Sequence, residues 1–368
     1  MSQAPAFGTF FLPGPTEVRP EILRAMLRPM IPHRGREYEA LHKRIVTGLQ
    51  AVFRTRRPVY LMTASATGAM EAAVRGAPEG PILSLVNGAF SERFARIAQN
   101  CDRQTRILSV PLGATHPLDL VEKALADGAF AAVTVVHSET STGALTDIRS
   151  VSDLAHRHGV MCLIDSVTGI GGTPVETDAW GLDFVLTGSQ KALALPPGLA
   201  FAVASEAYIL QAPATPNRGR YLDVLEYEEF ALRSQTPNTP ALSLLYAAEA
   251  QLATIAEEGI EARWARHAAM RAETESWVAA RQAEGTALGF LPRSGERSPT
   301  VSTLTLPAGV GASAVVQRVA ELGFVIGAGY GPLKETTIRI GHMGDHTVET
   351  LRPCLAAVRH ALIGDTAM

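Results

Sequence analysis

The chain has 368 residues, of which 46% are hydrophobic and 19% charged, a composition typical of a compact soluble protein with a large core. A net charge of −3 gives no reason to expect nucleic acid or an acidic membrane surface as a partner. The three cysteines, Cys101, Cys162 and Cys354, have neither metal-ligand nor disulfide-framework spacing, so we expect no metal site. Without a secretory signal pattern or a membrane-length apolar run, we expect a cytoplasmic protein.

The first two thirds of the chain alternate between short apolar runs and helical segments. Residues 1–20 are rich in proline and glycine and are expected to be extended, and helical periodicity follows over about 20–26 and 38–53. Strands are predicted at 59–62, 82–86, 131–136, 161–164 and 184–186. This alternation predicts an α/β domain in which helices cover a mostly parallel sheet.

The last third has a different pattern. One long helical stretch, about 241–284, is predicted to lead out of the sheet domain. A strand (about 300–306), a helix (312–322), a strand pair (324–341) and a final helix (345–362) follow, which indicates a small α+β domain. We therefore expect an extended segment at 1–20, a large domain at 21–255 and a small domain at 256–368.

Two residues near the ends of predicted strands suggest a specific chemistry. Lys191 follows the strand at 184–186 and lies among apolar residues, and a lysine partly removed from water becomes a usable amine nucleophile. Asp165 ends another apolar run, so its carboxylate points into the crevice where α/β proteins bind ligands. Alone, each has an ordinary explanation, a solvated loop lysine and a helix-capping aspartate. Together they are the pair that a pyridoxal phosphate enzyme needs, a Schiff-base lysine and a partner for the pyridine nitrogen.

Further residues after the strands are candidates for holding such a cofactor. Ser65, Ala66 and Thr67 open a helix, where backbone N–H groups and hydroxyls make either a phosphate site or a plain helix cap. The amide of Gln190 is placed to donate to the same phosphate. Phe90 follows the strand at 82–86 and either stacks on an aromatic cofactor or is an ordinary core residue.

The remaining candidates lie on two other segments. The polar run 137–143, which contains Thr140, follows a strand and supplies hydroxyls at its tip. Arg339 lies on a predicted strand between two isoleucines, where it either clamps a carboxylate or is a surface arginine. The glycine-rich run 327–331 precedes a strand rather than a helix, which excludes a dinucleotide-binding loop.

In this order the landmarks resemble the class V (fold type I) pyridoxal phosphate-dependent aminotransferases, in particular the alanine–glyoxylate, serine–glyoxylate and serine–pyruvate group. The resemblance runs from Leu12 to about Leu362. It implies a large domain with a seven-stranded, mostly parallel sheet sandwiched by helices, and a small C-terminal α+β domain. The matching segments are 13–15, 33–34, 65–71, 87–90, 139–143, 165–167, 188–191, 196–198 and 339–341.

The resemblance also implies a role for each candidate. Lys191 would form the Schiff base with pyridoxal 5'-phosphate and move the proton, and Asp165 would pair with the pyridine nitrogen. Thr140 would bind near the ring hydroxyl, Phe90 would cover the ring and Arg339 would bind the substrate α-carboxylate. The phosphate would be held by Ser65, Ala66, Thr67 and Gln190.

Relatives are homodimers with shared active sites, in which a tyrosine and a threonine of the partner subunit reach the phosphate. The corresponding stretch here, 234–240, contains Thr239 and also Thr236, but no tyrosine. Ala66 and Phe90 also depart from the glycine and tryptophan found in some relatives. We expect a homodimer in which Thr239 crosses to the partner.

The expected reaction is transfer of an amino group from alanine or serine to glyoxylate or pyruvate. One alternative is a phosphoserine or aspartate aminotransferase, for which His33, Arg34 and Arg36 would supply basic groups. A cysteine desulfurase would need a mobile nucleophilic cysteine, for which Cys354, in the expected last helix, is badly placed. A non-catalytic, hydrogenase-associated subunit is a third alternative, against which the intact lysine and aspartate argue.

Overall fold

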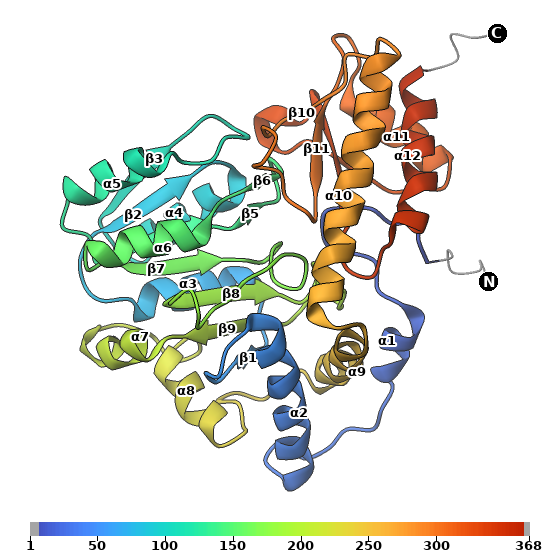
Figure 1. Cartoon of the computed structure of the whole chain (residues 1–368). Coiled ribbons are helices and arrows are strands. Elements are labelled where there is room, and N and C mark those ends of the chain that lie inside the picture. Colours follow the sequence, from blue (N-terminus) through green and yellow to red (C-terminus); the bar gives the residue numbers. More distant parts are fainter. Residues whose placement is uncertain (1–6, 364–368) are drawn as a thin grey trace.

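The computed structural model describes residues 7–363, so the outermost residues of both predicted terminal segments lie outside the described part. Within it, a seven-stranded sheet and a four-stranded sheet form two layered units joined by helices (Figure 1). A small ribbon of β5 (Ser138–Glu139) and β6 (Ala144–Leu145) lies beside the large sheet.

The large sheet has the strand order β1-β9-β8-β7-β4-β2-β3. Strand β9 is antiparallel to both of its neighbours, whereas the other six strands run in one direction. The prediction of a mostly parallel, seven-stranded sheet is confirmed. Its strands are β1 (Tyr60–Met62), β2 (Ile82–Val86), β3 (Thr105–Ser109), β4 (Ala132–Val136), β7 (Met161–Asp165), β8 (Phe184–Gly188) and β9 (Ala200–Ala204).

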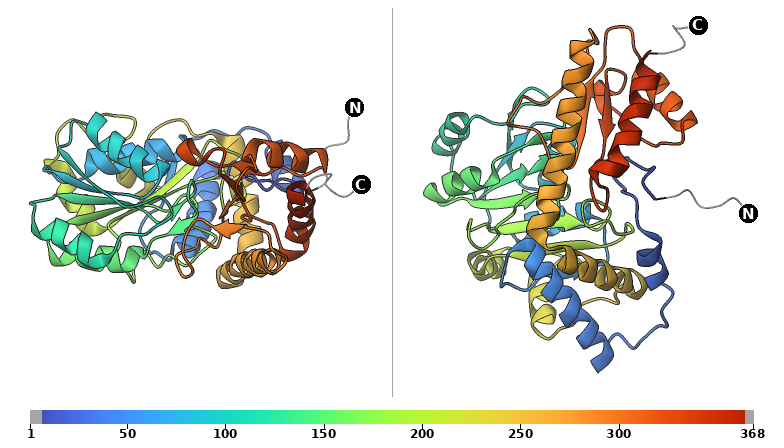
Figure 2. Two further views of the ribbon diagram at one scale, coloured as in Figure 1. Left: turned by 90° about the horizontal axis from the view of Figure 1, so that it is seen from above. Right: turned by 45° about the vertical axis from the view of Figure 1, so that its right-hand side comes forward.

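Helices cover both faces of this sheet because side chains on successive strand residues point to opposite faces. Leu83 and Leu85 pack in one buried cluster, while Ile82 packs in another. The view from above in Figure 2 shows the strands between two helical layers. The first layer contains α2 (Arg36–Phe53), α5 (Leu118–Ala126), α6 (Ile148–Arg157) and α9 (Leu242–Glu258). The second contains α3 (Ala66–Gly76), α4 (Ala89–Asn100), α7 (Glu206–Gln211) and α8 (Val224–Leu232).

Two features differ from the predicted elements. Strand β3 was not predicted, because it is an edge strand whose residues Arg106, Ile107 and Ser109 are exposed and which therefore lacks a buried apolar run. The stretch predicted over 241–284 is helical, but Gly259, where φ is 82°, divides it into two helices. A glycine adopts this left-handed conformation without the steric cost that other residues incur. The second half is the separate helix α10 (Ile260–Ala283).

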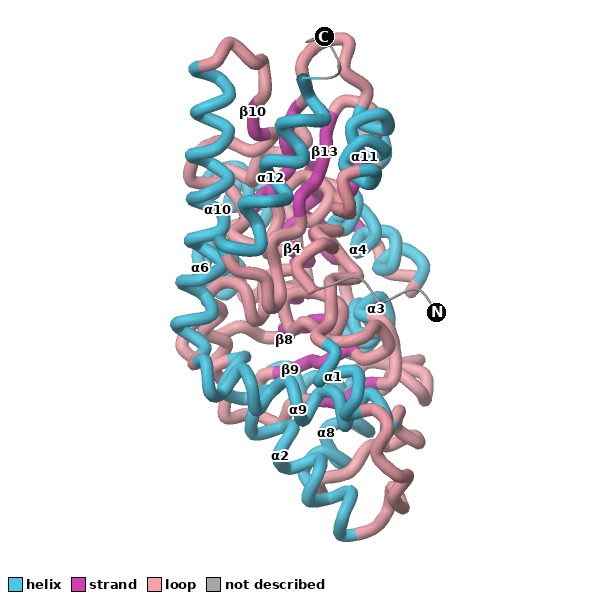
Figure 3. The backbone as a smooth tube through the Cα atoms, turned by 90° about the vertical axis from the view of Figure 1, so that its right-hand side faces the viewer, coloured by secondary structure: helices cyan, strands magenta, loops and turns pink. Residues whose placement is uncertain are grey.

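The four-stranded sheet is antiparallel throughout, in the order β10-β11-β13-β12. Helix α10 runs along one side of the molecule, from α9 to this sheet (Figures 1 and 3). Although α10 has 24 residues, no helix within residues 7–363 is long and apolar enough to cross a membrane. The domain boundary near residue 255 stays a prediction. The elements here are β10 (Gly289–Phe290), β11 (Ser302–Thr305), α11 (Ala312–Glu321), β12 (Gly327–Ala328), β13 (Thr337–Ile340) and α12 (Val348–Ile363).

The extended N-terminal segment, which leads into α1 (Pro20–Ala25), joins the two sheets. The N–H of Phe11 donates to the carbonyl of Val325 at 2.7 Å, and the N–H of Gly341 donates to the carbonyl of Phe11 at 2.7 Å. Further along, the N–H of Thr16 donates to the carbonyl of Gln190 at 2.9 Å. A Cβ atom at Gly341 would lie 2.5 Å from the carbonyl oxygen of Leu12, so only glycine allows this close approach.

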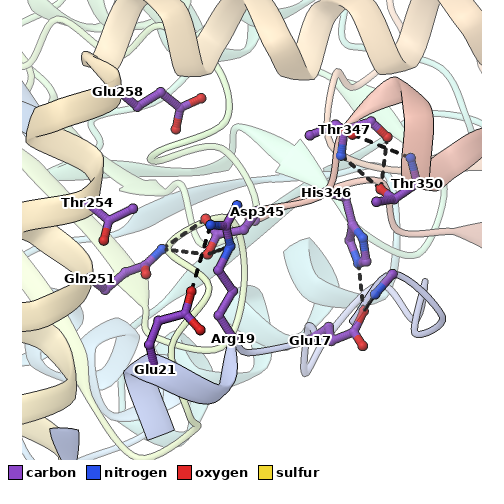
Figure 4. Close-up of polar contacts among 12 residues, drawn as sticks. Glu17, Arg19, Glu21, Gln251, Thr254, Glu258, Asp345, His346, Thr347 and Thr350 are labelled. Atoms are coloured by element: carbon purple, nitrogen blue, oxygen red, sulfur yellow. Dashed lines mark hydrogen bonds and ion pairs between the residues drawn. The ribbon is translucent and has the colours of Figure 1, made fainter. Parts of the chain in front are cut away.

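A buried ion pair ties these parts together. Arg263 on α10 is fully buried, and its guanidinium lies 2.9 Å from a carboxylate oxygen of Asp345, which is 2% exposed. Asp345 also accepts a hydrogen bond from the side-chain amide of Gln251 at 3.0 Å and lies 3.3 Å from the guanidinium of Arg19 (Figure 4). Four segments therefore meet at one carboxylate: the N-terminal segment, α9, α10 and the loop before α12.

We expect Asp345→Ala to lower the free energy of unfolding by about 3 to 5 kcal/mol, because it leaves part of the buried Arg263 charge uncompensated. Urea unfolding followed by circular dichroism measures the change. The exposed pair of Arg352 and Glu273, 2.8 Å apart, is the control. Glu273→Ala should cost less than about 1 kcal/mol. Equal costs for both variants would contradict a structural role for the buried pair.

Candidate active site

The loops after five strands bring the predicted residues to one edge of the large sheet. Strands β1, β2, β4, β7 and β8 all point their carboxyl ends to this edge, where open α/β sheets bind ligands. A cavity opens there, and eight of the ten predicted site residues line it. These eight are Ser65, Ala66, Thr67, Phe90, Thr140, Asp165, Gln190 and Lys191.

Lys191 is the buried amine of this cavity. It is 6% exposed, its ammonium donates a short hydrogen bond to the carbonyl of Pro13, and Nζ lies 5.7 Å from the centre of the Phe90 ring. Burial, together with the positive charge of Arg339, lowers the pKa of Lys191 to about 7. A substantial fraction of the side chain is therefore the neutral amine at neutral pH, which is the nucleophilic form.

Asp165 is the buried carboxylate of the cavity, at the end of β7. It is 2% exposed, and Oδ1 accepts the N–H of Val167 at 2.8 Å. Burial raises the pKa of Asp165 to about 7, and the negative charge of Glu139 adds to the effect. A protonated ring nitrogen beside this carboxylate would favour its ionised form, because an opposite charge lowers a carboxyl pKa.

The start of α3 is suited to an anion. Ser65 is the N-cap residue, but its side chain makes no capping hydrogen bond, so the first N–H groups of this 11-residue helix have no side-chain acceptor among the described residues. The exposed Ser65 and the half-buried Thr67 add hydroxyls, and Gln190 lies on the same cavity. An uncapped helix N-terminus beside two hydroxyls is a phosphate-binding arrangement. With the Lys191 amine and the Asp165 carboxylate, this donor set fits pyridoxal 5'-phosphate.

Phe90 and Thr140 line the cavity between these groups. Phe90 is half-buried and belongs to none of the hydrophobic core clusters of the described residues, and its ring is tilted against Tyr330, with centroids 5.9 Å apart. The hydroxyl of Thr140 is hydrogen-bonded to the hydroxyl of Thr168, another lining residue. The position of Phe90 favours the binding interpretation over that of a core residue, and the binding role of Thr140 stays a prediction.

Arg339 lies beside the cavity on β13. Its Nε donates to the carbonyl of Ala328 at 2.9 Å and its Nη1 to the carbonyl of Thr140 at 3.3 Å, which fixes the side chain. Its Nη2 has no hydrogen-bond acceptor within residues 7–363, so donors remain for a carboxylate. Its positive charge contributes to lowering the pKa of Lys191.

Thr239 does not join the cavity within this chain. It is exposed in the loop before α9, and Thr236 is buried, hydrogen-bonded to the hydroxyl of Tyr38 at 3.2 Å and to the carbonyl of Asn238 at 2.9 Å. Of the two threonines, Thr239 is thus the one whose side chain is open to a partner molecule. Its contact with a partner's phosphate stays a prediction.

Several lining residues were not predicted from the sequence. Arg93 lies one helical turn after Phe90, and its guanidinium is 4.8 Å from the centre of the Phe90 ring. Helical spacing from Phe90 was the available signal for it. The others are Met70, Val136, Ser138, Val167 and Thr168.

The basic and thiol groups of the alternative functions lie elsewhere. His33, Arg34 and Arg36 do not line the described cavity, and Arg34 donates to the backbone carbonyls of the 236–237 loop. Cys354 is buried in α12, where burial raises the pKa of its thiol to about 12. A thiol with so little thiolate at neutral pH is a poor nucleophile, which argues against a desulfurase reaction at Cys354.

A larger cavity at the opposite edge of the sheet does not have comparable chemistry. Its lining includes His156 and Asp183, but these two side chains are paired with each other at 2.7 Å. Asp183 also accepts the N–H of Cys162 at 2.8 Å. Because these polar groups satisfy one another, the cavity beside Lys191 is the candidate active site.

Comparison with known proteins identifies the family of this chain. Residues 25–341 match the family model described as aminotransferase class-V. The chain is 31% identical to mouse (Mus musculus) alanine–glyoxylate aminotransferase, covering 95% of this chain and 86% of that protein. It is 30% identical to serine–glyoxylate aminotransferase of Methylorubrum extorquens, covering 98% and 92%. The crystal structure of alanine–glyoxylate aminotransferase from Nostoc superposes with a TM-score of 0.89 at 29% identity, covering 98% of this chain and 97% of that one.

Buried histidines predict how stability depends on pH. Burial lowers the pKa of His137, His342 and His346 to about 4, from an ordinary value of 6.5. As pH falls below 6.5, the unfolded chain binds protons on these rings that the folded protein does not bind. Each of these histidines should therefore lower the free energy of unfolding by up to about 1.4 kcal/mol for every unit that the pH falls between 6.5 and 4. The raised pKa values of Asp165, Glu17 and His156 act in the opposite direction, but six histidines within residues 7–363 have lowered pKa values.

Urea unfolding at pH 7 and pH 5.5 measures this dependence. His137→Asn should make the pH dependence shallower, because one buried imidazole is removed. His158→Asn, at an exposed position, is the control and should leave the dependence as in the wild type. A His137→Asn protein with an unchanged pH dependence would contradict the assignment.

Proposed function

Because this chain belongs to the class V aminotransferases, we propose that it transfers the amino group of alanine or serine to glyoxylate or pyruvate, with pyridoxal 5'-phosphate as cofactor. The protein is an enzyme, a transferase of fold type I. The observation that carries the proposal is the buried pair of Lys191 and Asp165 in one cavity, with the free guanidinium donors of Arg339 beside it.

The residues of the cavity each supply one part of cofactor binding. The start of α3, with Ser65, Thr67 and Gln190, would hold the phosphate. Asp165 would keep the ring nitrogen protonated, and Phe90 would pack against the ring. When bound, pyridoxal phosphate supplies a covalent attachment for the amino group and a ring that accepts electron density from the substrate α-carbon.

The same chain positions the substrate and moves the proton. Arg339 binds the α-carboxylate through Nη2 and so fixes the amino acid relative to the ring, because a fork of N–H donors matches a carboxylate. Lys191 Nζ, with its pKa lowered to about 7, takes the proton from the substrate α-carbon. The same amine then donates this proton to the carbon through which the amino group is attached to the cofactor. Burial of this amine keeps bulk water from competing for the proton.

A second candidate substrate is an acidic amino acid such as aspartate. The observation that favours it is Arg93, which lines the cavity and has no acidic partner within residues 7–363. A second carboxylate on the substrate would compensate this charge. Phosphoserine is the other acidic donor that such a cation suits.

A homodimer in the cytoplasm completes the proposal. Leu27 and Met30, just after α1, are 83% and 63% exposed, and such apolar side chains together favour burial against another protein surface. A second copy of the chain is the partner that would bring the exposed Thr239 to a phosphate site. Because 234–240 contains no tyrosine, Thr239 would supply a larger share of the contacts with the partner's phosphate.

We expect purified enzyme to transfer amino groups from alanine and serine to glyoxylate and pyruvate in a coupled assay of the 2-oxo acid product. Lys191→Ala should abolish turnover, because it removes both the attachment point and the proton carrier, and borohydride reduction should label only the wild type with cofactor. Aspartate and phosphoserine belong in the same panel. A value of kcat/KM that is orders of magnitude higher for either one would replace the proposed donor.

Arg339→Ala should lower kcat/KM for the best amino acid by about 30- to several-thousand-fold, the effect of removing a charged pair worth roughly 2 to 5 kcal/mol. Arg339→Lys keeps the charge but not the fork, so it should remain impaired. Cofactor content, measured by absorbance, should stay normal. Arg103→Ala removes a half-buried arginine that also donates to backbone carbonyls, far from the cavity, and should leave kcat/KM unchanged. Wild-type kcat/KM in Arg339→Ala would exclude Arg339 as the carboxylate anchor.

A further inference from the structure

Glu139 is a buried carboxylate to which the proposed function gives no role. It lies in β5, directly after β4, and is 0% exposed. No lysine, arginine or histidine within residues 7–363 forms an ion pair with it, although burying a carboxylate without compensation is costly. Its hydrogen bonds explain how the charge is accommodated.

The carboxylate caps the first turn of α4. Its Oε2 accepts the N–H of Ser91 at 2.9 Å and that of Phe90 at 3.2 Å, and its Oε1 accepts the N–H of Ser141 at 3.1 Å. The hydroxyls of Ser91 and Ser141 donate to it as well. The Ser141 hydroxyl in turn accepts the N–H of Ala89 at 3.0 Å. A negative charge at this end of a helix is favoured by both the N–H donors and the helix dipole.

A glycine makes this contact possible. A Cβ atom at Gly88 would lie 2.5 Å from Glu139 Cδ and 2.6 Å from the Ser141 hydroxyl. Real side chains do not tolerate such distances, and here the groups they would displace are buried. The glycine of the Asn87–Gly88 pair is thus required by the approach of the carboxylate.

The capped turn and the capping segment each carry part of the active site. Phe90 and Arg93, on the first turns of α4, line the cavity, and Phe90 donates its own N–H to Glu139. On the other side, the carbonyl of Thr140, the next residue along the chain, accepts Nη1 of Arg339 at 3.3 Å. Glu139 therefore lies at the junction between the residue proposed to cover the ring and the residue proposed to bind the substrate.

We propose that Glu139 is a positioning residue, whose carboxylate fixes the Phe90 ring through the start of α4 and fixes Arg339 through the Thr140 carbonyl. The inference rests on the proposed roles of Phe90 and Arg339. Glu139 touches neither the substrate nor the reacting atoms. Through Phe90 and Arg339 it affects how tightly the cofactor and the substrate are bound and how they are oriented.

The charge itself is required, because the two oxygens both accept backbone N–H groups. In Glu139→Gln one oxygen becomes an NH₂ group. In one orientation this NH₂ faces the N–H of Ser91, and in the other it faces the N–H of Ser141. Neither orientation satisfies all the donors, so the capped turn must shift or lose a hydrogen bond.

The test compares wild-type and Glu139→Gln holoenzyme by three measurements. Equilibrium dialysis should show the pyridoxal phosphate dissociation constant raised by about tenfold or more, the effect of one unsatisfied buried donor. The visible circular dichroism band of the bound cofactor, which reports the asymmetry around its ring, should weaken. The KM for the best amino donor should rise by about tenfold because Arg339 is less well fixed.

Asp183→Asn is the matched control, because Asp183 is also a buried carboxylate that accepts a backbone N–H, but at the opposite edge of the sheet. It should lower stability and leave all three measurements unchanged. Glu139→Gln with reduced stability and an unchanged dissociation constant, dichroism band and KM would overturn the proposal and make Glu139 a purely structural residue.

Ser141→Ala is the second variant, needed if Glu139→Gln does not fold. It removes one donor to Glu139 and the acceptor of the Ala89 N–H, and should reproduce the same three changes at about threefold or more. Unchanged values in Ser141→Ala would then overturn the proposal. Wild-type protein that binds pyridoxal phosphate but transfers no amino group would contradict the proposed function, while the dissociation constant and the dichroism band would still decide the role of Glu139.

Discussion

The buried pair of Arg263 and Asp345 sets where the active-site lysine lies relative to the rest of the molecule. The same guanidinium that meets Asp345 donates to the carbonyl of Ala192 at 2.8 Å, one residue after Lys191. Helix α10 thereby holds the lysine loop, while Asp345 holds α9 through Gln251. Two charges that water cannot reach must stay paired, because separating them exposes each to a low-dielectric interior. The elements attached to them consequently have little freedom to rearrange.

The active site concentrates charges that the protein balances without direct ion pairs. Lys191, Arg339 and Arg93 are basic and Asp165 and Glu139 are acidic, yet no two of them form an ion pair within residues 7–363. Four of them are held by backbone groups or hydroxyls, and Arg93 lies over the Phe90 ring. Fixed dipoles hold a charge in place and leave it able to act on a ligand, whereas a direct ion pair would neutralise it. This arrangement suits the proposed binding of a phosphate, a ring nitrogen and a carboxylate.

The sequence was sufficient to predict the sheet and most of the cavity, for identifiable physical reasons. Buried parallel strands are continuous apolar runs, and the polar residues that follow them, such as Asp165 and Lys191, must gather at one edge. Strand β3 lacks such a run because it is an edge strand, and the helix break at Gly259 is a single residue in an otherwise helical pattern. Neither an exposed edge strand nor a single glycine can be recognised from the neighbouring residues alone.

Other site features depend on contacts between distant segments. The hydrogen bond from Lys191 to Pro13 and the one from Arg339 to Thr140 join residues that are far apart in the sequence. Arg93 could be inferred only once Phe90 was known to face the cavity. The role of Glu139 needed the geometry of its two oxygens, because a glutamate in a polar loop is ordinarily a solvated residue.

The N-terminal segment has a consequence for how the protein is made. Phe11 is hydrogen-bonded to Val325 and Gly341, which are synthesised more than 300 residues later, and the lysine's contact with Pro13 depends on the same segment. At translation rates of about 5–20 residues per second, the segment waits roughly 20 to 60 s for its partners. During that time its apolar side chains have no native surface to cover them. The candidate active site therefore cannot be completed until residues 325–341 have been synthesised.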